Sequence, residues 1–461
     1  MKAYPASVAA TLGIFLAHAL DVGRIARGPF TSKYLDQFAF CDYHCQCGLA
    51  AASSLYHFLG GLACPAIQSV FGARSVFLTF YFANVLADLG MLTPKYVLAS
   101  VVASSFLTQN ALLPYGEGLA EMTAVSRKLS QSHHVKMHGL AQRAAGLLGP
   151  WIGLLIGDFE SCVWWSLILT VAASSLPFLF ESCGGSGNDV HRALAYDSHI
   201  PPAFADAAAK SAVAFVLLWR FFSAFGFYAF NMLLTSSLLH AGPWLLASVG
   251  STCGIGELVA IKISFLLDAR QPDSGKFIWQ STSSVASVAL KVVALGRLSA
   301  FLVSSTGGAA GTSVAGSSSF SMGNIINTLD IGVLLFSLLV SILAATLLSD
   351  LQSQVVSRIV HIEGGTHIPH LERAADALAG VTGPLYIRSV VAQHGSGVAM
   401  AGIFSLYIVM HIFIHVGLSR IIAPFLTGIR ARHVSGRAAE PNAHEREQRG
   451  RSTAHHRGSS D

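Results

Sequence analysis

Charged side chains are rare inside the long apolar segments of this chain, and the few that occur there are its best candidates for chemistry. Arg220 lies in one such segment, with Tyr228 and Asn231 further along it. Asp330 lies in another segment, one turn after Asn327. A guanidinium can bind an anionic group or pair with a carboxylate, and aromatic rings can stack on its face. The pattern predicts an Arg220–Asp330 ion pair that opens and closes, an Arg220 that binds an anionic solute group, or a fixed structural pair.

Three further polar residues in apolar segments extend this candidate set. Asn110 and Glu117 occur in one segment, and Glu257 occurs in another. A charge at the centre of a bilayer costs at least ~2.5 kcal/mol on insertion scales, so each one needs a partner, a water-filled cavity or a function. Glu117 and Glu257 are therefore candidates for coupling to an ion or a proton, and a purely structural role is the alternative for Glu257.

The composition places these residues in a membrane. Hydrophobic residues make up 52% of the 461 residues, charged residues only 11%, and the mean hydropathy is +0.56. About a quarter of the residues of a soluble domain are charged. The chain is therefore predicted to be an all-α integral membrane protein with about twelve spanning helices of ~20 residues each. The expected centres of these spans are Leu12, Leu55, Tyr81, Ser105, Leu148, Leu167, Phe222, Gly254, Leu290, Phe336, Thr382 and Tyr407.

A short pattern occurs twice in the chain, each time at an apolar segment. Gly146-x-x-Gly149-Pro150 recurs as Gly380-x-x-Gly383-Pro384, at a constant offset of 234 residues (380 minus 146), about half of the chain. A halfway repeat is typical of transporters built from two pseudo-symmetric bundles. The sequence therefore predicts two six-helix halves. The expected parts are an N-terminal half at 1–181, a cytosolic linker at 182–210, a C-terminal half at 211–427 and a disordered basic cytosolic tail at 428–461.

The distribution of basic residues predicts the side of the membrane that each connection occupies. Lys and Arg are concentrated in alternate connections and in the tail, so by the positive-inside rule both termini are expected in the cytosol. The exception is a predicted first outer loop with Arg24, Arg27 and Lys33. The residues before it also resemble a cleavable signal, but an uncleaved first helix is favoured because cleavage would leave an odd bundle. A plasma membrane and an organelle membrane both fit these spans.

Clusters of cysteine and histidine raise the question of a metal. Cys41, Cys45 and Cys47 are close together, but their spacing matches no zinc-site pattern, so an outer disulfide or plain helix-end cysteines are expected. The loop histidines do not form the repeated boxes of a di-iron enzyme. His411 and His415, one turn apart, do not complete a site. We therefore predict no metal, no cofactor and no enzymatic activity.

In these motifs the chain resembles the major facilitator superfamily, secondary transporters of twelve helices in two halves. The segment at 146–153 is similar to the family's Gly-Pro-x-x-Gly signature, while the second copy has Ile387 where the last Gly would fall. The loop signature after span two is reduced to Gly72 and Arg74. Small residues at this spacing let helices pack closely, and the proline frees a backbone carbonyl, so the two copies are expected to act as packing pivots. The pivot residues are Gly146, Gly149, Pro150, Gly153, Gly380, Gly383 and Pro384.

The resemblance also implies which residues meet and what the protein does. The first helix of each triplet lines a central cavity in this family, so Arg220, Asp330 and Asn110 are expected to face one another, with Glu117 nearer the cytosol. The leading hypothesis is a secondary-active transporter of a small organic solute, coupled to an ion or a proton. The alternative is a transporter-like scaffold or receptor that moves nothing. The expected partners are the lipid bilayer, a small-molecule solute and a coupling ion or proton, with no nucleic acid.

Overall fold

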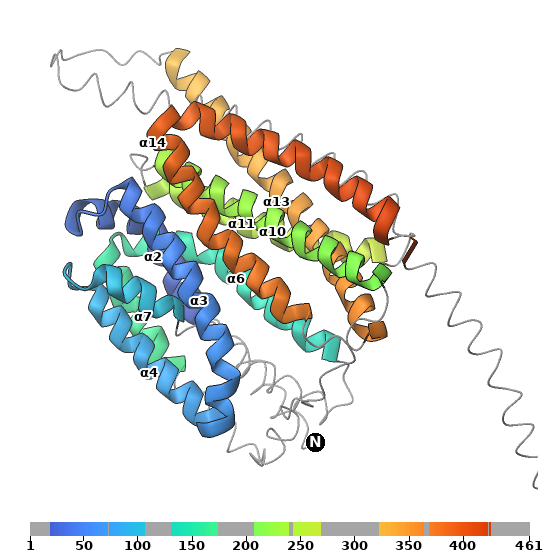
Figure 1. Ribbon diagram of the computed structural model, residues 1–461. Coiled ribbons are helices and arrows are strands. Elements are labelled where there is room, and N and C mark those ends of the chain that lie inside the picture. The colour runs from blue at the N-terminus through green and yellow to red at the C-terminus, as the bar shows by residue number, and fades with distance from the viewer. Residues whose placement is uncertain are drawn as a thin grey trace, which may run out of the picture.

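The computed structural model of the protein describes residues 19–71, 73–106, 131–173, 207–238, 243–268, 322–363, 368–422 and 424–425. The regular elements in these ranges are all helices and form one bundle (Figure 1), which confirms the all-α fold class. Their bounds are α2 Ala19–Phe38, α3 Tyr43–Phe71, α4 Ala73–Met91, α6 Gln131–Ile156, α7 Phe159–Ala173, α10 Ala207–Ser237, α11 Pro243–Asp268, α13 Met322–Glu363, α14 Ile368–Gly417 and the π-helix η2 Leu418–Ile422, with a further short helix that includes Val97–Phe106.

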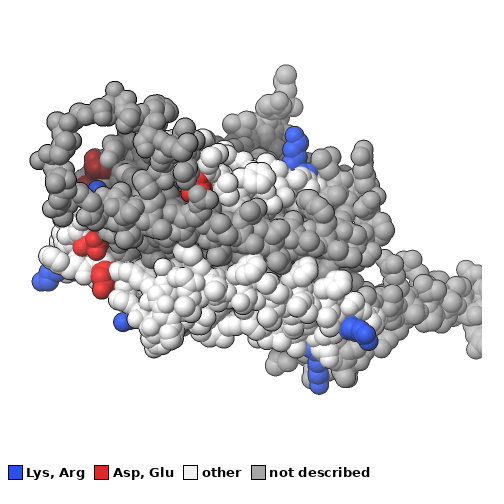
Figure 2. Space-filling model, turned by 90° about the horizontal axis from the view of Figure 1, so that it is seen from above, with Lys and Arg blue, Asp and Glu red and all other residues white. Residues whose placement is uncertain are grey.

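The length and composition of these helices fit a bilayer. Within the described residues, three segments are long and apolar enough to cross a membrane: Lys210–Thr235, Leu329–Leu347 and Leu371–Ile422. Four shorter apolar helices accompany them, namely Phe82–Met91, Val97–Phe106, Arg143–Ile156 and Phe159–Ala172. Figure 2 shows a broad uncharged surface on the described part of the chain, with charged side chains toward its ends. Such a surface suits lipid contact better than water.

Most of the predicted spans fall inside described helices. The expected centres of spans two to eight and ten to twelve all lie in helices, whereas Leu12 and Leu290 lie outside the described residues. Because α10 begins at Ala207, the last residues of the predicted linker are helical. The rest of that linker and the predicted tail at 428–461 also lie outside the described residues.

The last two predicted spans are the two arms of α14. Gly395 has φ 81° and ψ 170°, a conformation that breaks a helix and that glycine adopts without a steric penalty. The arms turn back on each other at this residue, and in Figure 1 the bend lies at the upper left, between the orange first arm and the red second arm. Thr382 lies on the first arm and Tyr407 on the second, so each arm corresponds to one predicted span.

The predicted first outer loop belongs to a helix. Arg24, Arg27 and Lys33 are part of α2, so the expectation that they occupy an outer loop is wrong. The helix extends through this polar stretch because both arginines find partners on neighbouring helices, as described below. These charges therefore lie on a helix of the bundle and not in a loop.

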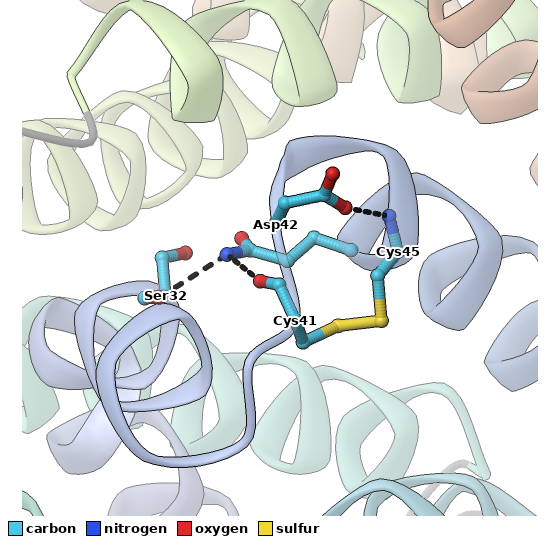
Figure 3. Close-up of a disulfide and its surroundings, with 5 residues drawn as sticks. Ser32, Cys41, Asp42 and Cys45 are labelled. Carbon is cyan, nitrogen blue, oxygen red and sulfur yellow. Dashed lines mark hydrogen bonds between the residues drawn. A yellow bond between two sulfur atoms is a disulfide. The ribbon is translucent and has the colours of Figure 1, made fainter.

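A disulfide closes the connection between α2 and α3, and Figure 3 shows its surroundings. Cys41 and Cys45 are bonded, which settles the two alternatives for these cysteines, while Cys47 is free and buried. The Asp42 carboxylate accepts the Cys45 backbone N–H at 2.8 Å and so caps the start of α3. The amide of Gln46 donates to the backbone carbonyls of Ser32 and Cys41, both at 3.1 Å, and ties the end of α2 to α3.

Close backbone approaches hold α6 against helices on both of its sides. A Cβ at Gly149 would lie 2.8 Å from the Ile25 side chain of α2, and a Cβ at Gly153 would overlap the backbone carbonyl of Ala26. On the other side, a Cβ at Gly254 of α11 would lie 2.8 Å from the carbonyl carbon of Gly146. Only residues without a side chain fit at such contacts. The first glycine of the repeated pattern thus faces α11, and the later ones face α2.

Prolines and hydroxyls complete the contact between α6 and α11. Pro150 has no N–H, so it weakens the hydrogen-bonding of the turn before it. The hydroxyl of Ser251 donates to the carbonyl of Leu147 in that turn at 2.9 Å, and a Cβ at Gly250 would lie 3.0 Å from Cγ of Pro150. The proline therefore packs directly on α11.

The second copy of the pattern makes corresponding contacts from α14. A Cβ at Gly380 would lie 2.8 Å from Cβ of Ser54 on α3. A Cβ at Gly383 would lie 3.1 Å from the carbonyl oxygen of Phe225 and 3.2 Å from the Ala229 nitrogen, both on α10. Ile387, where the last glycine would fall, is fully buried in a core cluster instead. In each copy the first glycine therefore meets a helix of the other predicted half, and the second meets a helix of its own half.

We expect Gly153→Val to destabilise the protein by at least about 1–3 kcal/mol, because the new side chain would overlap the backbone of α2. Gly332→Ala is the matched control, since a Cβ there meets nothing within 4 Å. Thermal unfolding in detergent measures both. Equal unfolding temperatures for the two variants would show that the contact between α2 and α6 tolerates separation.

Candidate functional site

Arg220 forms an ion pair in the C-terminal half, but not with the predicted partner. Its Nη2 lies 3.0 Å from Oδ1 of Asp376 on the first arm of α14, so the predicted Arg220–Asp330 pair is wrong. Arg220 lies ten residues into the span that begins at Lys210, roughly 15 Å along the helix at about 1.5 Å per residue and so near the middle of a bilayer. Both side chains are about one-third exposed, so the pair is not sealed within the bundle.

Further polar groups surround this pair. The phenol of Tyr228 lies close enough to Asp376 for a side-chain hydrogen bond, in which the phenol O–H donates. One turn before Asp376, Glu372 accepts a 3.3 Å hydrogen bond from the amide of Gln352, which is itself buried on α13. Two carboxylates therefore lie near one guanidinium. Arg220 and Tyr228, both predicted to contact the solute, therefore lie beside acidic residues that the sequence analysis did not select, and their role as solute contacts stays a prediction.

The residues of α14 that build this site share one face of the helix. Glu372, Asp376, Gly380 and Gly383 recur at spacings of four, four and three, which place them on one stripe of an α-helix. This stripe faces α3 and α10, because both glycines make their closest approaches there. The signal for Asp376 was present in the sequence as an acidic residue one turn before a pivot glycine.

Histidine 57 connects this cluster with the other predicted half. His57 lies on α3, within electrostatic range of Asp376 and Arg373 on α14. It is also within range of Arg24 on α2, and it donates a hydrogen bond to the backbone carbonyl of Ser105. The imidazole therefore lies between the polar groups of the N-terminal helices and those of α14.

A second polar contact between the halves involves Glu257. Its Oε2 lies 3.6 Å from Nε of Arg143, which places an ion pair across the contact between α11 and α6. The two side chains are 44% and 28% exposed, and an exposed pair contributes only about 0–1 kcal/mol. This pair can therefore open at little cost. Arg143 was not among the predicted site residues, although it lies one turn before Gly146.

The N-terminal helices hold a buried ion pair that the sequence did not predict. Nη1 of Arg27 on α2 lies 2.8 Å from Oδ1 of Asp88 on α4, and their side chains are only 8% and 2% exposed. The hydroxyl of Ser166 on α7 donates to the other Asp88 oxygen at 3.0 Å. Loss of one partner from such a pair costs about 3–5 kcal/mol, so this pair fixes the packing of three helices.

Arg24 lies one turn earlier on α2 and binds neutral oxygens. Its Nη2 donates to Oδ1 of Asn84 at 2.8 Å and to Oγ of Ser104 at 2.6 Å. Asn84 is on α4, and Ser104 belongs to the short helix that follows. The guanidinium thus joins α2 and α4 to the short helix, whereas Arg27 and Asp88 join α2 and α4 to α7. Together the two arginines make α2 the most polar of the described helices of this half.

The remaining predicted residues are only partly placed. Asn231 and Asp330 are half-buried on α10 and α13. The side chains of Asn110, Glu117 and Asn327 lie outside the described residues, so their predicted place in the cavity stays a prediction. Among the side chains that the structure describes, no group of three His, Cys, Asp or Glu could hold a metal ion.

Comparisons with known proteins agree with this architecture. No protein-family model and no curated protein matches the sequence. Among solved structures, the human organic anion transporter MFSD10 is similar with a TM-score of 0.54 at 15% identity, over 88% of this chain and 98% of that chain. The nucleoside transporter NupG gives 0.56 at 12% identity, over 89% and 98%. A POT family transporter in complex with 5-aminolevulinic acid gives 0.60 at 11% identity, over 89% and 96%.

These likenesses extend over nearly the whole of each solved chain, so they concern the complete bundle and not one shared hairpin. At such low identity a likeness shows the fold alone. The chain therefore has the helical fold of these solved transporters, and that is the fold expected from the resemblance of its motifs.

We expect Arg220 and Asp376 to be energetically coupled. Arg220→Gln and Asp376→Asn should each lower the unfolding temperature, because each leaves a charge beside a neutral group, and the double variant should recover part of the loss. A thermal unfolding cycle should give a coupling of about 0.5–3 kcal/mol. Lys210→Gln, which removes an exposed charge at the start of the same helix, controls for general charge effects. Strictly additive losses would rule out a direct interaction.

Proposed function

We propose that this protein is a secondary-active transporter that moves a small organic solute by alternating access. One observation carries the proposal: the contacts between the two predicted halves are made of glycines backed by weak polar pairs. Gly146 meets α11 beside the partly exposed Arg143–Glu257 pair, and Gly380 meets α3 near His57. Contacts of this kind can separate and re-form, because the ion pair that the described residues place across them is only partly buried and contributes little.

The fold supports the same proposal. The solved structures with this fold are named as transporters of organic anions or nucleosides, or were solved with 5-aminolevulinic acid. All of these solutes are small and organic. A static scaffold would gain more from an apolar interface than from one that places a partly exposed ion pair across the halves.

We assign solute contact to the polar cluster of α10 and α14. Arg220 and Asp376 lie at mid-membrane depth and are partly exposed, with Tyr228 beside them. They can bind complementary charges of a solute while aromatic side chains of α10 contact its apolar part. Asn231, Asp330, Asn327 and Asn110 remain proposed members of the same cavity.

The coupling role is assigned to carboxylates that connect the halves. Glu257 can change partners when its pair with Arg143 opens, so it is the first candidate for proton or ion coupling, with Glu117 as a second. Asp376 is a third candidate, because it faces both Arg220 and His57. A proton on any of these groups would remove one attraction and shift the balance between two states of the bundle.

The first experiment is a thermal-shift panel on purified protein with sugars, amino acids, organic anions, nucleosides and drug-like cations. A solute at 100 times its dissociation constant stabilises the protein by about 2.7 kcal/mol. The best solute is then tested for counterflow in proteoliposomes. Arg220→Ala should abolish counterflow and leave a folded protein.

A cross-link tests the movement itself. Gly48→Cys combined with Arg388→Cys places two thiols at the contact of α3 and α14, because a Cβ at Gly48 would lie 3.9 Å from Nη1 of Arg388. Linking the thiols with a short bifunctional reagent that contains a disulfide should stop counterflow and reduction should restore it, whereas the unchanged chain and the Gly48→Cys variant should respond to neither treatment. Undiminished counterflow by the cross-linked protein would refute alternating access at this contact. Binding without counterflow in the unchanged chain would favour the receptor or scaffold alternative.

A further inference from the structure

A small pocket lies within the N-terminal helices, apart from the cluster at Arg220. Its volume is about 200 Å³, and it lies between α2, the end of α4, the following short helix and the start of α7. At ~30 Å³ per water molecule it has room for about seven waters, and it is smaller than the 300–1,000 Å³ typical of drug-sized ligands. A ligand of this pocket must therefore be small.

The wall of the pocket has a donor-rich side and an apolar side. Arg24, Arg27, Thr31, Ser104 and Ser105 supply two guanidiniums and three hydroxyls. The apolar side consists of Leu35, Met91, Val97, Val101 and Phe159. Such a wall matches a molecule with an anionic head and a short apolar body.

Both guanidiniums are held in place before any ligand arrives. Arg27 is fixed by its 2.8 Å pair with Asp88, and Arg24 by its hydrogen bonds to Asn84 and Ser104. A guanidinium has five N–H donors, so it can hold these acceptors and still donate to a carboxylate. Binding to fixed donors avoids the entropy cost of ordering long side chains.

We propose that this pocket binds a small amphipathic organic anion, with its carboxylate against Arg24 and the hydroxyls and its apolar part against Leu35, Met91 and Phe159. The site lies near the ends of α2 and α4 and the start of α7, on the side where the disulfide joins α2 and α3. If the pocket serves transport, small amphipathic anions are the solute class of the transporter proposed above, and this step rests on the proposed function. Binding itself can be measured without transport.

Hexanoate is the probe, and hexanamide is its neutral match in size and shape. On the full-length chain in detergent, hexanoate should raise the unfolding temperature with a saturable dose dependence, and hexanamide should not. Arg24→Gln should weaken the apparent affinity for hexanoate at least about tenfold, because it removes a charge-assisted hydrogen bond. Arg420→Gln removes an exposed arginine of η2 instead and should leave the affinity unchanged.

A second variant keeps the test decisive if Arg24→Gln fails to fold. Val101→Asp places a carboxylate in the pocket wall, where it should occupy the guanidiniums and abolish the response to hexanoate. Equal stabilisation by hexanamide, or an undiminished response in Arg24→Gln or Val101→Asp, would overturn the anion site. Counterflow of another solute without a hexanoate response would refute this site alone. Hexanoate binding without counterflow of any tested solute would refute the transport function alone.

Discussion

The structure depends on close approach between helix backbones at a few glycines. In a bilayer, helices gain no hydrophobic free energy by leaving lipid for each other, so they associate through van der Waals packing and interhelical hydrogen bonds. Gly149 and Gly383 bring α6 and α14 onto α2 and α10, while Gly146 and Gly380 bring the same helices onto α11 and α3. Each repeated helix is therefore packed on two sides, and the distances between all polar groups follow from these contacts.

The three ion pairs that join described helices have different roles because their exposure and their places in the bundle differ. Arg27–Asp88 is almost fully buried, so breaking it would leave an unpaired charge inside the protein. The pair therefore stays closed and holds α2 against α4. Arg143–Glu257 is only partly buried, so water can reach either partner, and the pair stabilises the contact between the halves only weakly. Arg220–Asp376 is exposed to about the same extent, but it joins two helices of the C-terminal half. Rigid halves with a weak contact between them are what a rocking motion requires.

The sequence predicted the positions of the helices and of the close-packed glycines better than it predicted which residues pair with the charged side chains. Apolar length and the repeat located most spans, and the glycine pattern indicated where backbones meet. Helical periodicity gives the face of a residue but not the helix opposite, so Asp376 was missed and Asp330 was paired with Arg220 wrongly. Arg24 and Arg27 were assigned to a loop because a hydropathy average treats two arginines as an interruption, although in this helix they are satisfied by Asn84, Ser104 and Asp88.

Charged groups of the two halves lie on either side of one histidine. The N-terminal pocket presents two guanidiniums, one of them paired with Asp88, whereas the stripe on α14 presents Glu372 and Asp376 near Arg220. His57 lies between them, within electrostatic range of Arg24 and Asp376. A positive charge on His57 is attracted to Asp376 and repelled by Arg373 and Arg24, so α14 and α2 both act on this imidazole. An anion bound at Arg24 reduces one of these repulsions, and this is the electrostatic route by which occupancy of the proposed pocket acts on the contact of α3 with α14.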